Sequence, residues 1–133
     1  MSFMTQIRVK DAASLLGVSD DTVRRWIDQG ELPATTDSSN LTVIDGKALA
    51  KLAQEHANPA DDPLGIESSA RNRFVGLVTK VTSDRVMSQV ELQCGPYRVI
   101  SLMSTEAVED LGLEVGVVGV ASIKSTHVVI ETK

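Results

Sequence analysis

Apolar residues in the first half of the chain recur at the spacing of an α-helix. One apolar face is formed by Val9, Ala12, Ala13, Leu15 and Leu16. We expect Gly17 to end this helix in the left-handed conformation. Ser19 is well placed to cap a second helix that runs to Gln29. The pattern therefore predicts two helices joined by a tight turn.

The next stretch predicts a hairpin and a third helix. Residues 34–44 are rich in Thr and Val around a polar turn at residues 38–40, which is typical of two short paired strands. Trp26, on the second helix, is expected in the core, where it would pack that helix on the hairpin. Asp45 precedes an apolar-periodic stretch over residues 46–56 and is expected to cap it.

In the second half of the chain the pattern changes to runs rich in Val and Ile, which favour β-strands. Five strands are predicted, over residues 74–81, 86–93, 97–103, 115–123 and 128–130, with a turn at residues 94–96. Residues 105–111 predict one short helix capped by Ser104. Five short strands within residues 69–133 indicate a small β-barrel.

A change of composition separates the two halves. Residues 57–65 contain two prolines, one glycine and two aspartates, which is the composition of a linker. We therefore expect two domains, residues 1–56 and residues 68–133, joined by a linker over residues 57–67.

Composition narrows the classes of function. The 133 residues are 42% hydrophobic, which suits a packed core, and they contain no apolar run long enough to span a membrane. Residues 1–10 lack the features of a signal peptide, and one cysteine can form neither an internal disulfide nor a zinc cage, so a cytoplasmic location is expected. Aromatic residues at 3% argue against a stacking surface for single-stranded nucleic acid. The net charge of −5 argues against non-specific coating of DNA, but it leaves room for a small DNA-reading face.

The first two predicted helices and the turn between them form a helix-turn-helix pattern, in which the second helix reads DNA. The guanidinium fork of Arg suits guanine edges and phosphates. Candidate DNA contacts are the polar and basic residues Lys10, Ser19, Thr22, Arg24, Arg25 and Lys47. Residues 7–33, with the string TVRRWIDQGELPA starting at Thr22, resemble the MerR-like, excisionase-type winged helix-turn-helix family. An alternative is that this unit only docks a protein partner, because residues 35–40 of the expected wing contain no base.

Three strings in the second half carry another resemblance: SSARNRFVG from Ser68, LGLEVG from Leu111 and VASIKSTHV from Val120. In this order and spacing they resemble the molbindin (Mop) domain, a TOBE-type small β-barrel. The resemblance implies binding of molybdate, with tungstate as a close mimic. The implied contacts are the side chains of Ser69, Asn72, Lys124 and Ser125 and the backbone N–H groups of Ala70 and Arg71.

The same resemblance implies that Ser104 contacts the anion from a neighbouring subunit, and that Ala107 stands where the family often has a second hydroxyl. A tetrahedral dianion needs converging donors and a balancing cation, and hydroxyls, an amide, N–H groups and one lysine meet that need. A barrel of this size buries little core alone, and the resemblance to Mop domains implies partners that exchange strands. We therefore expect a homo-oligomer, at least a dimer, and the resemblance leaves a hexamer open.

These observations indicate an α+β protein. The expected parts are a mainly α, winged helix-turn-helix domain and a small OB-like β-barrel of Mop type. The first hypothesis for its function is a molybdate-responsive, DNA-binding transcriptional regulator with double-stranded DNA as partner. The alternative is a cytoplasmic protein that stores or buffers molybdate or tungstate. An enzyme is not expected, because the chain has no Ser/His/Asp or Cys/His set, no metal-ligand cluster and no Gly-rich phosphate loop, and no catalytic cofactor is expected either.

Overall fold

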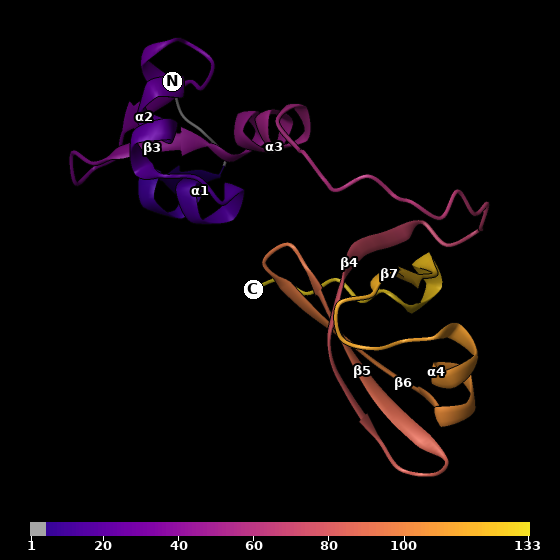
Figure 1. Ribbon diagram of the computed structural model, residues 1–133. Helices are drawn as coiled ribbons and strands as arrows, with labels where there is room; N and C mark the ends of the chain where they lie inside the picture. The colour runs from indigo at the N-terminus through magenta and orange to yellow at the C-terminus, as the bar shows by residue number, and fades with distance from the viewer. Residues whose placement is uncertain (1–4) are drawn as a thin grey trace. The chain divides into compact units, whose positions relative to one another are not determined.

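The computed structural model describes residues 5–133, which divide into two compact units between Asn58 and Pro59 (Figure 1). The domain and linker boundaries drawn from the sequence stay a prediction. Every helix within residues 5–133 falls short of the length and hydropathy that a bilayer-spanning segment needs.

The first unit combines three helices with a small antiparallel sheet. The helices are α1 (Val9–Leu16), α2 (Asp20–Asp28) and α3 (Gly46–Glu55). The strands are β1 (Gln6–Arg8), β2 (Ala34–Thr36) and β3 (Thr42–Asp45), in the order β1-β3-β2. The hairpin of β2 and β3 forms the wing, as the sequence predicts. β1 was not predicted, because three residues carry no readable periodicity and only pairing with β3 makes them a strand.

The predicted caps of the first unit are confirmed. Gly17 ends α1 at a φ of 67°, in the left-handed region that glycine adopts without strain. The Ser19 hydroxyl accepts a hydrogen bond from the Thr22 N–H at 3.1 Å, and the Asp45 carboxylate accepts one from the Lys47 N–H at 3.3 Å. The two N-caps, Ser19 and Asp45, each satisfy an N–H group that has no partner inside its own helix.

The core of the first unit lies between the helices and the sheet. It is built from Val9, Ala12, Ala13, Val23, Trp26, Leu32, Ile44, Leu49 and Leu52. Leu15 is 68% exposed, so its assignment to the buried face was wrong. Successive helix residues turn by about 100°, which takes Leu15 off the face that Val9, Ala12 and Ala13 share.

Trp26 is buried, as expected, and one neighbour of its ring is His56. The two ring centroids lie 5.1 Å apart, with the planes tilted by 43°. Because His56 is the C-cap residue of α3, this contact packs α2 on the end of α3. The expected packing of Trp26 on the hairpin stays a prediction.

The second unit is a curled antiparallel sheet with one helix. Its strands are β4 (Asn72–Ser83), β5 (Met87–Cys94), β6 (Tyr97–Ser104) and β7 (Val118–Ile123), in the order β6-β5-β4-β7. Helix α4 (Thr105–Leu111) lies beside β5 and β6, and the 3₁₀ turn η1 (Ser125–His127) follows β7 (Figure 1). The Ser104 hydroxyl caps α4 by accepting the Ala107 N–H at 3.0 Å, as predicted.

Two predictions about the strands were wrong. Residues 128–130 form no strand, and Val129 and Ile130 are 79% and 86% exposed. A β-branched run favours a strand, but it becomes one only where a neighbouring edge supplies hydrogen-bond partners. The last sheet strand begins at Val118 instead of Val115, because the Val117 N–H closes a turn onto the Glu114 carbonyl at 3.1 Å.

The core of the second unit lies on the inner face of the sheet, where Val78, Val90, Leu92 and Cys94 pack with Val108 of α4. The fold class predicted from the sequence is confirmed. The protein is α+β, with a winged helix-turn-helix unit followed by a small OB-like unit.

Candidate functional site

Strand pairing brings together two segments that the sequence separates by about fifty residues. Asn72, the first residue of β4, pairs with Ile123, the last residue of β7. The Asn72 side-chain amide donates to the Ile123 carbonyl at 3.0 Å. Ser69, Ala70 and Arg71 precede β4, and Lys124 and Ser125 follow β7. Both groups of candidate oxyanion contacts therefore lie at the same end of the β4–β7 strand pair, the edge formed by Asn72 and Ile123 (Figure 1).

The candidate donors at this edge differ in their exposure and in the hydrogen bonds that they already make. Ser69, Arg71, Lys124 and Ser125 are exposed, whereas Ala70 is buried and its N–H donates to the Ser68 hydroxyl at 3.1 Å. An anion that takes the Ala70 N–H would have to displace this hydroxyl. One proton of the Asn72 amide is engaged by Ile123, and an amide has a second to offer.

Ser104 lies elsewhere in the chain. It pairs with Met87 at the start of β5, and the neighbouring Ser88 pairs with Ser83 at the far end of β4. Asn72 and Ser83 are the first and last residues of β4. In the sheet of one chain, Ser104 therefore lies at the end opposite to the one that holds Asn72 and Lys124.

Arg73 is a neighbour of this edge that sequence reasoning did not select. Its Nε donates to the Asp62 carboxylate at 2.8 Å, which attaches the segment before β4 to the strand beside Asn72. The hydrogen bonds from Arg73 and from the Leu64 N–H lower the pKa of Asp62. No local pattern indicates such a pair, because its partners lie eleven residues apart in a proline-containing stretch.

The candidate DNA contacts lie on three elements of the first unit. Lys10 and Lys47 are each the second residue of a helix, α1 and α3, and both are exposed. Arg24 and Arg25 are exposed on α2. The hydroxyls of Ser19 and Thr22 lie 3.0 Å apart and are engaged with each other at the start of α2.

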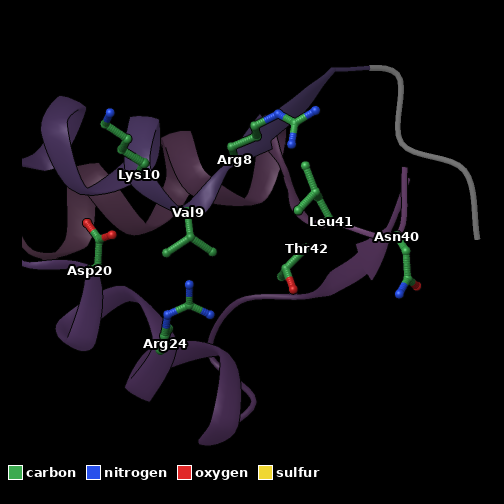
Figure 2. Close-up of a pocket in the computed structure, with 8 residues that line it drawn as sticks. All are labelled: Arg8, Val9, Lys10, Asp20, Arg24, Asn40, Leu41 and Thr42. Carbon is green, nitrogen blue, oxygen red and sulfur yellow. The ribbon is translucent and has the colours of Figure 1, made fainter. Parts of the chain in front are cut away.

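Figure 2 shows a pocket that gathers two of these candidates. It is lined by Arg8, Val9, Lys10, Asp20, Arg24, Asn40, Leu41 and Thr42. The Arg24 side chain extends from α2 toward Val9, with Asp20 on one side and Thr42 on the other. Ser19, Thr22, Arg25 and Lys47 are outside this lining. Arg8 and Asn40 are additions that the sequence did not indicate.

Comparison with known families agrees with the two units. A helix-turn-helix domain model matches residues 7–57, and a TOBE domain model matches residues 68–130. The fold and the candidate sites thus define a helix-turn-helix domain fused to a TOBE-type domain.

Curated relatives sharpen this class. Molybdenum-pterin-binding protein 3 of Clostridium pasteurianum is 41% identical over 63 residues, which are 47% of this chain and 93% of that protein. The chain belongs to the molbindin (Mop) family, with a helix-turn-helix domain fused to its Mop domain.

Two longer relatives match a smaller part of their own length. Transcriptional repressor DcmR of Methylorubrum extorquens is 34% identical over 76 residues, 52% of this chain and 29% of that protein. Molybdenum transport protein ModE of Herbaspirillum seropedicae is 33% identical over 70 residues, 52% of this chain and 26% of that protein. In both cases the aligned segment of this chain covers less than a third of the relative's own length.

Among solved structures, MopII from Clostridium pasteurianum has a TM-score of 0.47 and 34% identity, covering 50% of this chain and all of that one.

By their names, the three curated relatives bind or transport molybdenum compounds or repress transcription, and none of the three is named as an enzyme.

Proposed function

We propose that this chain is a molybdate-binding transcriptional regulator whose binding to double-stranded DNA responds to molybdate. The helix-turn-helix domain would read DNA and the Mop domain would bind the anion. We assign residues 1–56 to the first domain, 57–67 to the linker and 68–133 to the second. The names of the relatives, which include a molybdenum-pterin-binding protein and a transcriptional repressor, support both parts of this proposal.

The hydrogen bond from Asn72 to Ile123 is the observation that carries the anion site. It supports the proposal because it joins the start of β4, which follows Ser69 to Arg71, to the end of β7, which precedes Lys124 and Ser125. These residues offer hydroxyls, an amide, backbone N–H groups and one ammonium. A tetrahedral dianion such as molybdate or tungstate needs many donors and a cation, and it carries no proton to donate in return.

The site needs a second copy of the chain. Ser104 lies at the other end of the sheet, so it would reach an anion only at the edge of a neighbouring subunit. A mainly apolar cavity of about 380 Å³ is lined by residues of all four strands, β4 to β7, and the apolar residues 128–130 are exposed. Exposed apolar surface of this kind favours burial against a partner. We propose at least a dimer, with the anion bound between subunits.

An anion held between subunits can alter how two helix-turn-helix units are presented to DNA. Coupling requires that molybdate bind two subunit arrangements with different affinity. Paired reader helices would meet half-sites about one helical turn apart, at about 34–36 Å.

We place the protein in the cytoplasm, because its single cysteine, Cys94, is a buried thiol.

A second candidate is a molybdate storage or buffering protein whose first unit docks a partner. The observation that favours it is charge, since residues 1–56 hold six bases and eight acids and the wing residues 35–40 hold no base. A protein of this kind would retain molybdate without retaining duplex DNA.

The first experiment is titration calorimetry with molybdate, tungstate and sulfate on the full chain. Lys124→Ala is the test variant, and Lys80→Ala, an exposed lysine on β4, is the matched control. We expect micromolar or tighter molybdate binding, which corresponds to about −8 kcal/mol or better, no response to sulfate, and loss in Lys124→Ala only. Equal heats for all three anions would contradict the anion site.

The second experiment measures duplex binding with and without molybdate. Different affinities for a duplex selected from a random pool support the regulator. Duplex affinity that is equal in both conditions contradicts the coupling, and an absence of duplex binding at low salt supports the storage alternative.

A further inference from the structure

Half of the basic residues in the helix-turn-helix unit line one pocket. Over residues 5–58 the bases are Arg8, Lys10, Arg24, Arg25, Lys47 and Lys51, and the first three line the pocket of Figure 2. Asp20 is the acid among the lining residues. With Asp37, which pairs with Arg8, counted beside Asp20, the three bases leave a net charge of +1, in a unit that has more acids than bases. This local excess of positive charge attracts an anion.

Arg8 is held in place by the wing. Its Nη2 donates to the Asp37 carboxylate at 3.1 Å. The other oxygen of Asp37 accepts the N–H groups of Ser39 and Leu41, at 2.9 and 3.0 Å, so the same carboxylate shapes the turn of the wing. A guanidinium carries five N–H groups, and this ion pair engages one of its nitrogens. The Arg8 guanidinium is therefore positioned beside a wing turn that has no base of its own.

The remaining lining supplies neutral donors. Asn40 has a φ of 61°, a left-handed conformation at the end of the wing turn, and its side chain carries an amide beside the pocket (Figure 2). Thr42 adds a hydroxyl. The first N–H groups of α1 receive no side-chain cap from Arg8. Arginine, lysine, amide, hydroxyl and helix N-terminal N–H groups are the donors that proteins use toward DNA phosphates.

The position of the pocket decides which phosphate source is favoured. The pocket is lined by residues of α2, the proposed reader helix, and of the wing. A duplex whose major groove holds α2 has backbone phosphates along both sides of that helix, and the pocket flanks α2 on the side of the wing. Its volume of about 250 Å³ equals that of about eight water molecules, enough for a phosphate group with part of its hydration.

We propose that this pocket binds one backbone phosphate of double-stranded DNA, and that Arg8, held by Asp37, donates to it through the N–H groups outside this ion pair. The inference rests on the proposed DNA-binding function and adds to it a phosphate site and a residue. Because a phosphate contact carries no base information, its loss should weaken binding to every sequence alike.

The test is fluorescence anisotropy of the full chain with a labelled random-sequence duplex across a salt series. The pocket variants are Arg8→Gln and Arg24→Gln, and Lys51→Gln is the control, since Lys51 is exposed on α3 outside the pocket. Loss of one phosphate contact should reduce the slope of log K against log salt by about 0.9 and weaken binding about eightfold at 0.1 M salt. The control should bind as the unaltered chain does.

Asp20→Asn should raise duplex affinity, whereas Arg8→Gln and Arg24→Gln should lower it. Removal of the one acid in the lining should tighten duplex binding at low salt, a gain that a poorly folded variant does not produce. If the unaltered chain binds duplex while Arg8→Gln and Arg24→Gln match Lys51→Gln, the phosphate pocket is refuted and the DNA-binding function stands. If the unaltered chain binds no duplex at low salt, the phosphate pocket and the DNA-binding function are both refuted.

Calorimetry with molybdate separates the duplex from a free oxyanion. Arg8→Gln should leave the number of molybdate sites unchanged. If that variant loses a molybdate site and keeps its duplex affinity, the pocket holds the free anion and the proposal is wrong.

Discussion

Arg73 and Asp62 join the segment before β4 to the strand that begins the candidate anion site. The Arg73 Nε lies 2.8 Å from the Asp62 carboxylate, whose other oxygen accepts the Leu64 N–H at 3.0 Å. The Nη2 atom of Arg73 is buried without a hydrogen-bond partner among the described residues. The pairing of this guanidinium in the fold thus depends on Asp62, and the stretch from Asp62 to Leu64 is not a free tether.

Asp62→Ala should release this segment. The Leu64 amide would lose its acceptor, so we expect its hydrogen exchange to accelerate and proteolytic cleavage within residues 57–67 to increase. Asp61→Ala is the matched control, because it removes a neighbouring exposed carboxylate. Equal protection of the Leu64 amide in both variants would contradict the role of Asp62.

The same contact should be sensitive to acid. The hydrogen bond from Arg73, and next that from Leu64, hold the pKa of Asp62 below its ordinary value of 3.8. A carboxyl whose pKa is lower in the folded state stabilises the fold fully above the ordinary pKa and loses this contribution as pH falls through the lowered one. Carboxyl chemical shifts and Leu64 exchange, followed below pH 4, should change together.

Ser104 and Lys124 should act on one anion from different chains. Ser104→Ala and Lys124→Ala should each weaken molybdate binding, because a hydrogen bond to a charged group contributes about 1.5–3 kcal/mol. Coexpression of the two variants should recover tight sites, since an intact Ser104 from one chain can meet an intact Lys124 from the other. Calorimetry of the coexpressed protein measures the recovered fraction.

The control for this complementation is the double variant on a single chain, which has no intact pair to contribute and should recover nothing. At equal total chain concentration, heats from the coexpressed protein that equal the mean of the two single variants would refute a shared site.

Gly76→Ala should destabilise the second unit. A Cβ at this position would clash with the Gln93 carbonyl oxygen, so the β4 backbone would have to move. Overpacking of this kind costs about 1–3 kcal/mol and lowers Tm by several degrees in a domain of this size. Gly119→Ala is the control, because its Cβ would meet only Leu92 at an ordinary 3.4 Å. Equal thermal shifts would contradict the close approach at Gly76.

Ser19→Ala should destabilise the first unit by about 1 kcal/mol, because the Thr22 N–H loses its cap. Trp26 is the one tryptophan of the chain and is buried in this unit, so its fluorescence reports the transition in denaturant. Ser14→Ala removes an exposed hydroxyl from α1 and should change the midpoint little. If Ser14→Ala destabilised the unit as much as Ser19→Ala, the loss of the Ser19 cap would not be the cause of the destabilisation.

Local chemistry explains why much of the fold was predictable. The caps at Ser19, Asp45 and Ser104 and the left-handed end at Gly17 each depend on groups within a few residues. The helices and the four sheet strands follow from periodicity and β-propensity over similarly short windows. The strand predicted over residues 128–130 failed because its composition was suitable but its pairing partner was absent from the rest of the described chain.

The candidate anion site was readable from the sequence as ordered strings. Its assembly was not, because Asn72 and Ile123 are fifty-one residues apart and meet only through the β4–β7 register. The pocket with Arg8 had no sequence signal, since Arg8 and Asp37 are twenty-nine residues apart and their ion pair depends on the return of the wing.

The sequence by itself determined the order of the elements, their caps and the residue types of both candidate sites, because these depend on neighbours along the chain. The tertiary structure alone decided that β1 joins the first sheet, that Leu15 faces outward, that Asp62 anchors the segment before β4, and that Ser104 and Lys124 lie at opposite ends of the second sheet. Those outcomes depend on strand register and packing between distant segments, which local propensity does not encode.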